Sequence, residues 1–176
     1  MMRLFVALEP EPGVRQALAD LQGRLRALGV TGRYLSPVHL HLTLAFIGMW
    51  PEDISGLLPP VRQPFSIALN GLGVFPEAKV LWAGVQPSQA LSGLADHVRD
   101  ALSAAGIPYD RKPFFPHMTL VRKPVLPERF QLEEVPIPPA VMTVRSVCLY
   151  RSEHTENGMA YTVIGRGMAS GDIMVQ

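Results

Sequence analysis

Two short segments of the chain combine a histidine with a threonine at the same spacing. His41 and Thr43 lie in the sequence His-Leu-Thr-Leu, and 76 residues later His117 and Thr119 lie in His-Met-Thr-Leu, although the chain has only five histidines. Two imidazoles that face one site act as general acid and general base near neutral pH, and threonine hydroxyls hydrogen-bond anionic oxygens. This combination suits hydrolysis of a phosphodiester, which needs one proton taken from water and one given to the leaving oxygen.

Each segment is typical of a β-strand, in which alternate side chains face opposite sides. His41 and Thr43 then share one face while Leu42 and Leu44 share the other, and the second segment repeats this pattern. The apolar side chains are expected to fill a core while the polar pair faces outward. For the two pairs to act on one substrate, both must face a common cleft.

The elements before the two motifs also occur twice in the same order. In each copy a short apolar run, over 3–8 and over 79–85, is typical of a buried strand and is followed by proline. A segment with helical spacing of apolar residues comes next, over 14–28 and over 91–105. The sequence therefore predicts a strand, a helix, a loop and a His-x-Thr strand in each half.

The residues at the ends of the predicted helices agree with this repeat. Ser88 is a suitable N-cap for the second helix, and Gly29 and Gly106 follow the last apolar positions as stops. These glycines are 77 residues apart, whereas Pro37 and Pro113, in the loops before the motifs, are 76 apart. A single one-residue gap reconciles the two offsets, which indicates an internal duplication.

We therefore predict an α+β fold of two pseudo-symmetric lobes, with mostly antiparallel sheets, outer helices and a central cleft that carries both motifs. The chain is expected to form a single bilobal domain, with repeat units at roughly 3–75 and 79–166. Further strands are predicted in the segments PFSIALNGLGVF, MTVRSVCLY and AYTVIGR. Beyond Met168 the tail is expected to be frayed.

Composition excludes several classes of protein. With 16 basic and 15 acidic residues, the net charge of +1 excludes a nucleic-acid binder that relies on overall charge, although it allows a local basic cleft. The single cysteine, Cys148, excludes an intrachain disulfide and a multi-cysteine metal cage, and favours a reducing compartment. No apolar run approaches the ~18 residues of a membrane span. We expect a cytoplasmic monomer without membrane association or an obligate protein partner.

Phe46 and Arg122 occupy equivalent positions, five residues after His41 and His117. On a regular strand that offset places both on the face opposite the histidines. If each strand ends or bulges first, Arg122 can hold a phosphate with two hydrogen bonds and Phe46 can stack on a base. Otherwise Phe46 is a core residue and Arg122 a solvated strand end.

His39 shares a predicted strand face with His41, so a metal site with His117 as the third ligand is a competing interpretation. Neither motif has a neighbouring carboxylate to hold a dication, and Phe115 stands at the position equivalent to His39. We therefore expect neither a metal nor a cofactor. Structural or surface roles are predicted for the two remaining histidines, His97 beside the second helix and His154 in a loop.

The paired His-x-Thr motifs on a duplicated α+β scaffold resemble the 2H phosphoesterase superfamily. Within it, RLFVAL, LSPVHLHLTLAFIG, KPFFPHMTLVR and LYRSE…YTVI are similar to segments of the RNA 2′,3′-cyclic phosphodiesterases, also called 2′-5′ RNA ligases. The similarity runs from Arg3 to about Ile164. The resemblance implies metal-independent hydrolysis of a 2′,3′-cyclic phosphate at an RNA end to a 2′-phosphate, and reversible 2′-5′ ligation of RNA ends.

The same resemblance implies a role for each residue of the two motifs. His41 would be the proton donor to the leaving 3′ oxygen, and His117 the proton acceptor that activates water. Thr43, Thr119 and Arg122 would hold the phosphate. The partner implied is RNA with a 2′,3′-cyclic phosphate terminus.

The chain departs from the family's pattern at Ala45, Phe115 and His39, which replace a frequent lysine, a frequent basic residue and a common asparagine. The cleft is therefore expected to be less basic than usual and to rely on three cations, Arg122, Lys112 and Arg151. Two other functions compete with RNA-end hydrolysis. One is the same chemistry on small cyclic nucleotides or 2′-5′ oligonucleotides, and the other is a nucleotide- or RNA-binding module without turnover. Two intact motifs argue against the binding module, because binding alone needs no proton carriers.

Overall fold

The computed structural model describes residues 1–167, so the predicted fraying of the tail beyond Met168 lies outside the described residues. The helices and strands in chain order are β1 (Met2–Leu8), α1 (Pro12–Ala27), β2 (Thr31–Tyr34), β3 (Leu42–Trp50), β4 (Phe65–Phe75), β5 (Val80–Val85), α2 (Gln89–Ala104), β6 (His117–Val125), β7 (Val141–Val144), β8 (Cys148–Thr155) and β9 (Gly158–Arg166). Three 3-10 turns connect them, η1 (Pro37–His39), η2 (Ser55–Leu57) and η3 (Leu132–Glu134).

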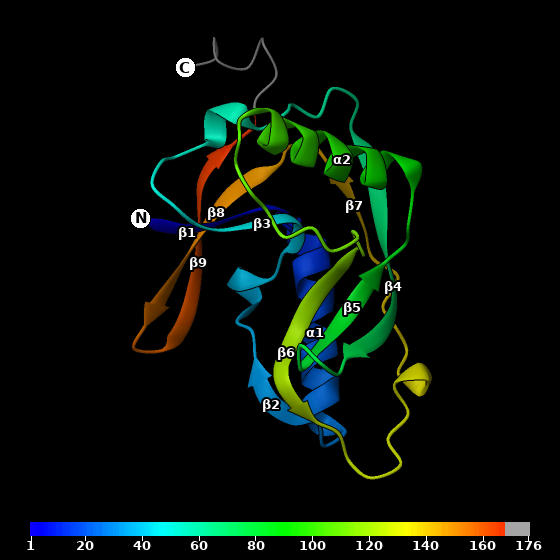
Figure 1. The fold of residues 1–176 in the computed structure, drawn as a ribbon. Coiled ribbons are helices and arrows are strands. Elements are labelled where there is room, and N and C mark those ends of the chain that lie inside the picture. Colours follow the sequence, from blue (N-terminus) through cyan, green and yellow to red (C-terminus); the bar gives the residue numbers. More distant parts are fainter. Residues whose placement is uncertain (168–176) are drawn as a thin grey trace.

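The strands of the described residues form two lobes that meet at the His-x-Thr segments. They pair in the order β7-β4-β5-β6-β3-β1-β8-β9, with β2 also on β6, and every pairing is antiparallel. Only one residue pair, Leu42 with Met118, joins β3 to β6. This narrow junction separates two lobes, whose strands are labelled in Figure 1. We call β3, β1, β8 and β9 the upper lobe and β7, β4, β5, β6 and β2 the lower lobe. The predicted α+β fold of mostly antiparallel sheets is confirmed.

Each helix crosses from one lobe to the other: it follows a strand of one lobe and packs against the sheet of the opposite lobe. The helix α1 follows β1 in the chain but contacts β6 and β7, and α2 follows β5 but contacts β3 (Figure 1). Strands are exchanged in the same way, because β4 lies in the lower lobe and β8 and β9 lie in the upper lobe. Both lobes are therefore built from both halves of the sequence, which ties the two motifs to one rigid frame.

The helix boundaries follow the predicted signals. The apolar face of α1 is buried, whereas Leu28, which we expected to continue it, is the C-cap and 45% exposed. Gly29 follows with φ +93°, the left-handed conformation that ends many helices, and Gly106 does the same after α2 with φ +73°. The side chain of Ser88 accepts a hydrogen bond from the Leu91 backbone N–H, which confirms it as the N-cap of α2.

One predicted strand region holds two strands. The segment MTVRSVCLY divides into β7 and β8, separated by residues 145–147. The strand β7 pairs with β4 in the lower lobe, and β8 pairs with β1 in the upper lobe. The chain crosses between lobes at this point, so a single continuous strand cannot satisfy both pairings.

Apolar side chains of both lobes form one large buried cluster, and a smaller cluster lies on the cleft side of the upper sheet. The smaller cluster comprises Phe5, Ala7, Cys148 and Tyr150. Among residues 1–167, no helix is long and apolar enough to cross a membrane.

Candidate active site

A bulge in β3 determines which side chains accompany the first histidine. The pairing of β3 with β1 skips Leu44, so Leu44 and Ala45 are consecutive buried residues. Phe46 therefore returns to the face that carries His41 and Thr43. The sequence left open whether Phe46 belongs to the core or to the site, and the bulge places it on the site face.

The same bulge occurs in β6. Its pairing with β5 skips Leu120, so Leu120 and Val121 are consecutive buried residues. Arg122 therefore lies on the face of His117 and not on the opposite one. A bulge adds one residue to one strand of a pair and so redirects the side chains that follow it. Both copies of the motif carry this irregularity at equivalent positions, which brings Phe46 and Arg122 to the cleft.

The two imidazole rings are held by identical hydrogen bonds. His41 Nδ1 lies 2.7 Å from the carbonyl oxygen of His39, and His117 Nδ1 lies 2.7 Å from that of Phe115. A carbonyl oxygen only accepts, so each Nδ1 carries the hydrogen and donates it. In the neutral ring, Nε2 then has a free lone pair, and in the charged ring it carries a proton. Both rings are thus arranged to exchange a proton through Nε2.

Aromatic rings enclose both histidines. The ring of His41 lies 4.7 Å from that of Phe5, 5.1 Å from Tyr161 and 5.6 Å from Tyr150. Around His117 the corresponding rings are Phe75 at 5.0 Å, Trp82 at 6.0 Å and Phe115 at 6.2 Å. These walls fix the two rings and keep water away from their faces.

This enclosure lowers the pKa of both histidines. Burial is the main cause for His41, whose pKa falls from 6.5 to about 4; the hydrogen bond to the His39 carbonyl opposes the fall, and the positive charges of Arg122 and His117 add to it. Burial also lowers the pKa of His117. The charge on one histidine therefore disfavours a charge on the other. Both rings are neutral in the free protein at neutral pH.

Two cavities meet at the motifs. One, of about 310 Å³, lies on the His41 side, and the other, of about 580 Å³, lies on the His117 side. Thr43 and Phe46 line both, so the two cavities adjoin across this pair. Thr119 is half-buried on the same strand face as His117, but it is not among the residues that line either cavity. The structure thus brings five of the six predicted site residues to these two cavities, and Thr119 lies outside them.

Arg122 lines the His41-side cavity although it follows His117 in the chain. Its Nη2 donates a hydrogen bond of 3.0 Å to the Tyr161 hydroxyl, which holds the guanidinium in place. The guanidinium of Arg3 lies 5.2 Å from the centre of the Phe46 ring. Each lobe therefore supplies a cation to the cavity next to His41.

Sequence reasoning misplaced two histidines. His39 does not share a strand face with His41, because it lies in η1, before β3 begins. It contributes its carbonyl to the His41 ring and lines a separate cavity beside Tyr161. His154 is not in a loop but in β8, and it lines the His41-side cavity. Within residues 1–167, no group of three or more His, Cys, Asp and Glu side chains is placed to hold a metal ion.

The predicted basic residues are only partly at the cleft. Lys112 lines the His117-side cavity beside Asp110, but the side chain of Arg151 pairs with that of Glu153 at 2.9 Å and lines neither cavity. The structure instead adds residues that sequence reasoning missed: Arg3, Phe5, Ser152, His154 and Tyr161. Strand alternation in the LYRSE segment was a usable signal, because it places Tyr150, Ser152 and His154 on one face.

Comparisons with known proteins agree with the fold and the motifs. The profile of the 2'-5' RNA ligase superfamily matches residues 10–156. The RNA 2',3'-cyclic phosphodiesterase of Thermus thermophilus is 30% identical and covers 97% of this chain and 92% of its own length. The protein of that name from Escherichia coli is also 30% identical, and the match covers 93% of this chain and 94% of the relative.

Solved structures give the same result. The crystal structure of Escherichia coli LigT complexed with 3'-AMP has a TM-score of 0.75 at 29% identity and covers 94% of this chain and 96% of that chain. A crystal structure of a Thermus thermophilus protein has a TM-score of 0.74 at 32% identity, and the match covers 94% of this chain and 97% of that chain. The chain therefore belongs to the 2'-5' RNA ligase superfamily of 2H phosphoesterases, as its paired motifs predicted.

Proposed function

We propose that the protein hydrolyses a 2′,3′-cyclic phosphate at an RNA end to a 2′-phosphate, with two histidines as proton carriers and without a metal. The observation that carries this proposal is the pair of imidazoles, each held through Nδ1 by a carbonyl two residues earlier. Relatives that cover most of the chain are named RNA 2',3'-cyclic phosphodiesterase, which supports this substrate.

The reaction needs a base and an acid on opposite sides of the phosphorus. Nε2 of His117 takes a proton from water as the water oxygen attacks phosphorus, and the bond from phosphorus to the 3′ oxygen breaks. Nε2 of His41 gives its proton to that oxygen, which leaves as a hydroxyl. Thr43, Thr119 and Arg122 hold the non-bridging oxygens, whose charge develops in the transition state.

The lowered pKa of His41 places a condition on its role as acid. A ring with a pKa of about 4 is neutral at pH 7, and a proton donor must be charged. The charge of Arg122 contributes to that low value. A bound phosphate brings negative charge next to both groups, which offsets the guanidinium and raises the pKa of His41. The acid is therefore protonated as substrate binds.

Phe46 lines both cavities, and we propose that it stacks on a base of the substrate. The same site runs 2′-5′ ligation when the 5′-hydroxyl of another RNA takes the place of water. In ligation the two histidines keep the roles they have in hydrolysis, and in the reverse reaction, cleavage of a 2′-5′ linkage, they exchange roles.

The test uses RNA with a 2′,3′-cyclic end in EDTA, with the 2′- and 3′-phosphate products resolved. We expect full activity, a 2′-phosphate product, and a loss of about 10²- to 10⁴-fold in each of His41→Ala and His117→Ala. An analogue with sulfur as the 3′ leaving atom separates the roles, because a thiolate leaves without a proton. His41→Ala should regain activity on it, and His117→Ala should not. If His117→Ala regains activity instead, His117 is the acid and His41 the base. Loss of activity in EDTA would contradict the metal-independent two-histidine mechanism.

A further inference from the structure

The cavity on the His41 side adjoins a larger one. The larger cavity, of about 680 Å³, lies between α1, β2 and the β8–β9 hairpin. It shares Arg122, Met159 and Tyr161 with the His41-side cavity, so the two adjoin, and together we call them the His41-side groove. His41 lines the smaller part of the groove, and His117 lines neither part of it.

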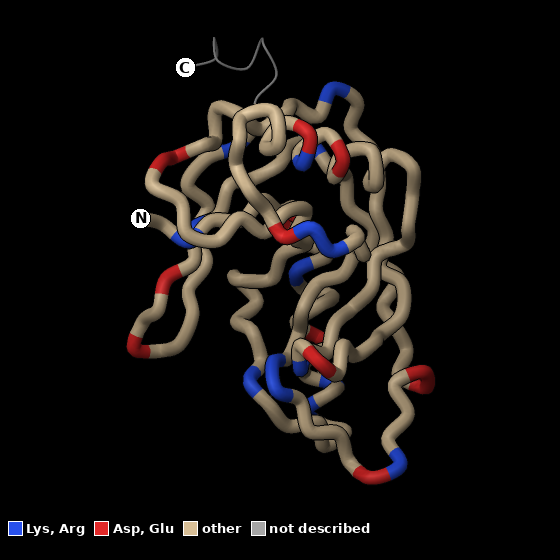
Figure 2. Tube along the Cα trace, viewed as in Figure 1, with Lys and Arg blue, Asp and Glu red and all other residues tan. Residues whose placement is uncertain are grey.

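Cations, and no acidic residue of the described part of the chain, line the groove. Its charged and titratable lining residues include Arg3, Arg26, Arg33, Arg122, His39, His41 and His154. The His117-side cavity differs, because Glu77 and Asp110 accompany its cations. Figure 2 shows basic residues gathered on β2 and the adjoining part of β6, in the lower lobe. In a chain of net charge +1, this separation of charge favours a polyanion in the groove and not in the other cavity.

Two of these arginines are direct cross-strand neighbours. Arg33 in β2 lies opposite Arg122 in β6, and both line the larger cavity. Like charges directly opposite each other on paired strands repel. A phosphate near this pair offsets the repulsion, so the pairing favours an anion in this part of the groove.

A residue with a buried hydroxyl that lacks a partner lines the other part of the groove. Ser152 is only 7% exposed, its Oγ has no hydrogen-bond partner within the described residues, and it lines the cavity next to His41. On the adjacent strands it lies opposite Arg3 and Tyr161, which line the same cavity. Buried hydroxyls are normally hydrogen-bonded, and a hydroxyl both donates and accepts. The missing partner is expected to be a group of the ligand.

We propose that the His41-side groove binds the RNA strand upstream of the cyclic phosphate, with Arg3 and Arg33 on backbone phosphates and Ser152 on the terminal nucleotide. This inference rests on the proposed function, in which His41 protonates the leaving 3′ oxygen. That oxygen belongs to the ribose of the same strand, so the strand lies on the His41 side. The groove then favours an RNA oligonucleotide over a free cyclic nucleotide as substrate.

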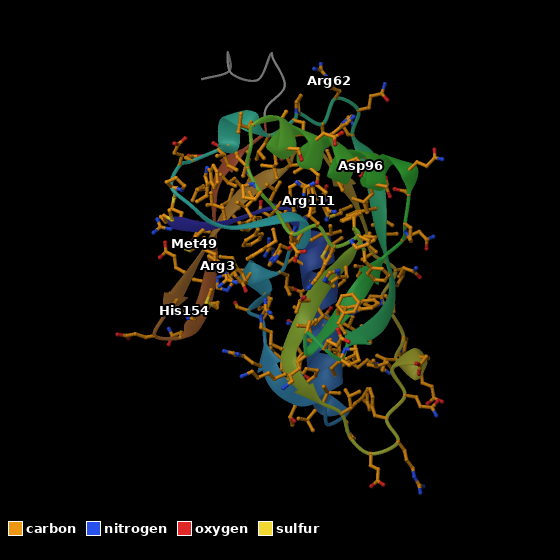
Figure 3. All side chains as sticks on the ribbon, in the orientation of Figure 1. Arg3, Met49, Arg62, Asp96, Arg111 and His154 are labelled. Carbon is orange, nitrogen blue, oxygen red and sulfur yellow. The ribbon has the colours of Figure 1, made fainter. Side chains whose placement is uncertain are left out.

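The first test compares a hexanucleotide that ends in a 2′,3′-cyclic phosphate with cytidine 2′,3′-cyclic phosphate. Arg3→Gln and Arg33→Gln should each lower kcat/KM on the hexanucleotide about 3- to 10-fold more than on the mononucleotide. Each variant should also have a shallower slope of log binding constant against log salt concentration for the hexanucleotide. The slope should decrease by about 0.7, because one contact to a single-strand phosphate is lost. The matched control is Arg62→Gln, an exposed arginine that Figure 3 shows far from Arg3 and His154 and that should behave as wild type.

The second test concerns the hydroxyl. Ser152→Ala should raise KM about 3- to 30-fold on both substrates while the melting temperature stays equal or rises, because a buried group without a partner is removed. A purely structural serine would lower the melting temperature and leave KM alone. Ser66→Ala, the same change at an exposed site on β4, is the control and should alter neither.

Binding of a fluorescent hexanucleotide with a 2′-phosphate end separates this inference from the proposed function. Suppose that the wild type hydrolyses cyclic phosphates, but kcat/KM of the arginine variants falls equally on both substrates and their binding keeps the wild-type salt slope. The RNA strand then lies outside the groove. If the wild type hydrolyses no cyclic phosphate, the proposed function fails, and the binding slopes of Arg3→Gln and Arg33→Gln still decide whether the groove holds RNA.

Discussion

At the scale of single residues, the two catalytic candidates are alike in geometry but different in charge environment. Both histidines donate through Nδ1 to a carbonyl at 2.7 Å, yet only His41 lies among the cations that help to lower its pKa to about 4. Burial is the main cause of the low pKa of His41, and the charge of Arg122, whose counterpart in the other copy is Phe46, adds to it. Two imidazoles with the same hydrogen bonding therefore differ in their surroundings.

The pH dependence of the reaction follows from these pKa values. The reaction needs one charged and one neutral imidazole, and kcat/KM reports the free protein. Because the pKa values of His41 and His117 both lie below 6.5, kcat/KM should peak below pH 6.5 and fall as pH rises beyond neutral. The kcat optimum should lie higher, since bound phosphate raises the pKa of His41. Rate profiles between about pH 4 and pH 9 check this, and a kcat/KM maximum above pH 7 contradicts it.

At the scale of elements, the site depends on two strand irregularities and on a close approach between strands. The bulges at Leu44 and Leu120 turn Phe46 and Arg122 toward the cleft. Beside His117, the Trp82 ring lies over Gly73 of the neighbouring strand, where an added Cβ would overlap the ring. The glycine is therefore required for the aromatic wall of His117 to form.

Gly73→Ala should accordingly displace Trp82 and destabilise the lower lobe by about 1–3 kcal/mol, the usual cost of overpacking. Tryptophan fluorescence should change, and activity should fall because the wall beside His117 moves. Gly93→Ala is the matched control, since nothing lies within 4 Å of an added Cβ there and the position is inside α2. It should stabilise the protein by about 0.5–1 kcal/mol. Equal melting temperatures for the two variants would show that Trp82 is not constrained by Gly73.

At the scale of the whole molecule, a pseudo-symmetric frame carries an unsymmetrical charge distribution. The helices and outer strands are exchanged between lobes, so the lobes cannot separate without breaking both sheets. The cations lie along one side of the junction, and the other side is aromatic with balanced charge. Burying the histidines in this frame makes folding depend on their neutral state.

Stability should therefore decrease as pH falls below 6.5. The folded pKa of His41, about 4, lies below the unfolded value of 6.5, so the unfolded chain binds the proton first. The contribution of neutral His41 to the free energy of unfolding is complete above pH 6.5 and is lost as pH falls toward the folded pKa. Each unit of difference between the folded and unfolded pKa corresponds to about 1.4 kcal/mol. The lowered pKa values of His117 and His39 act in the same direction.

Melting temperatures at pH 7 and pH 5 measure this effect. His41→Asn keeps a donor for the His39 carbonyl but removes the titrating ring, so its melting temperature should fall less between the two pH values than that of the wild type. Parallel decreases in both proteins would assign the acid sensitivity to other groups.

The sequence alone determined the fold class, both helices with their ends and the two His-x-Thr pairs. These rest on local signals, because helical periodicity, N-caps, glycine stops and strand alternation need only neighbouring residues. Local signals did not reveal the division of MTVRSVCLY into β7 and β8, because it is set by the crossing of the chain from one lobe to the other. The predicted position of His39 on the strand of His41 was wrong, since His39 lies in a 3-10 turn before that strand. Tertiary structure alone decided that Arg122 and Phe46 face the cleft, because bulges arise from the register between strands. It also decided that Arg3, Ser152 and His154 line the cleft, since residues distant in sequence meet there only once the strands pair.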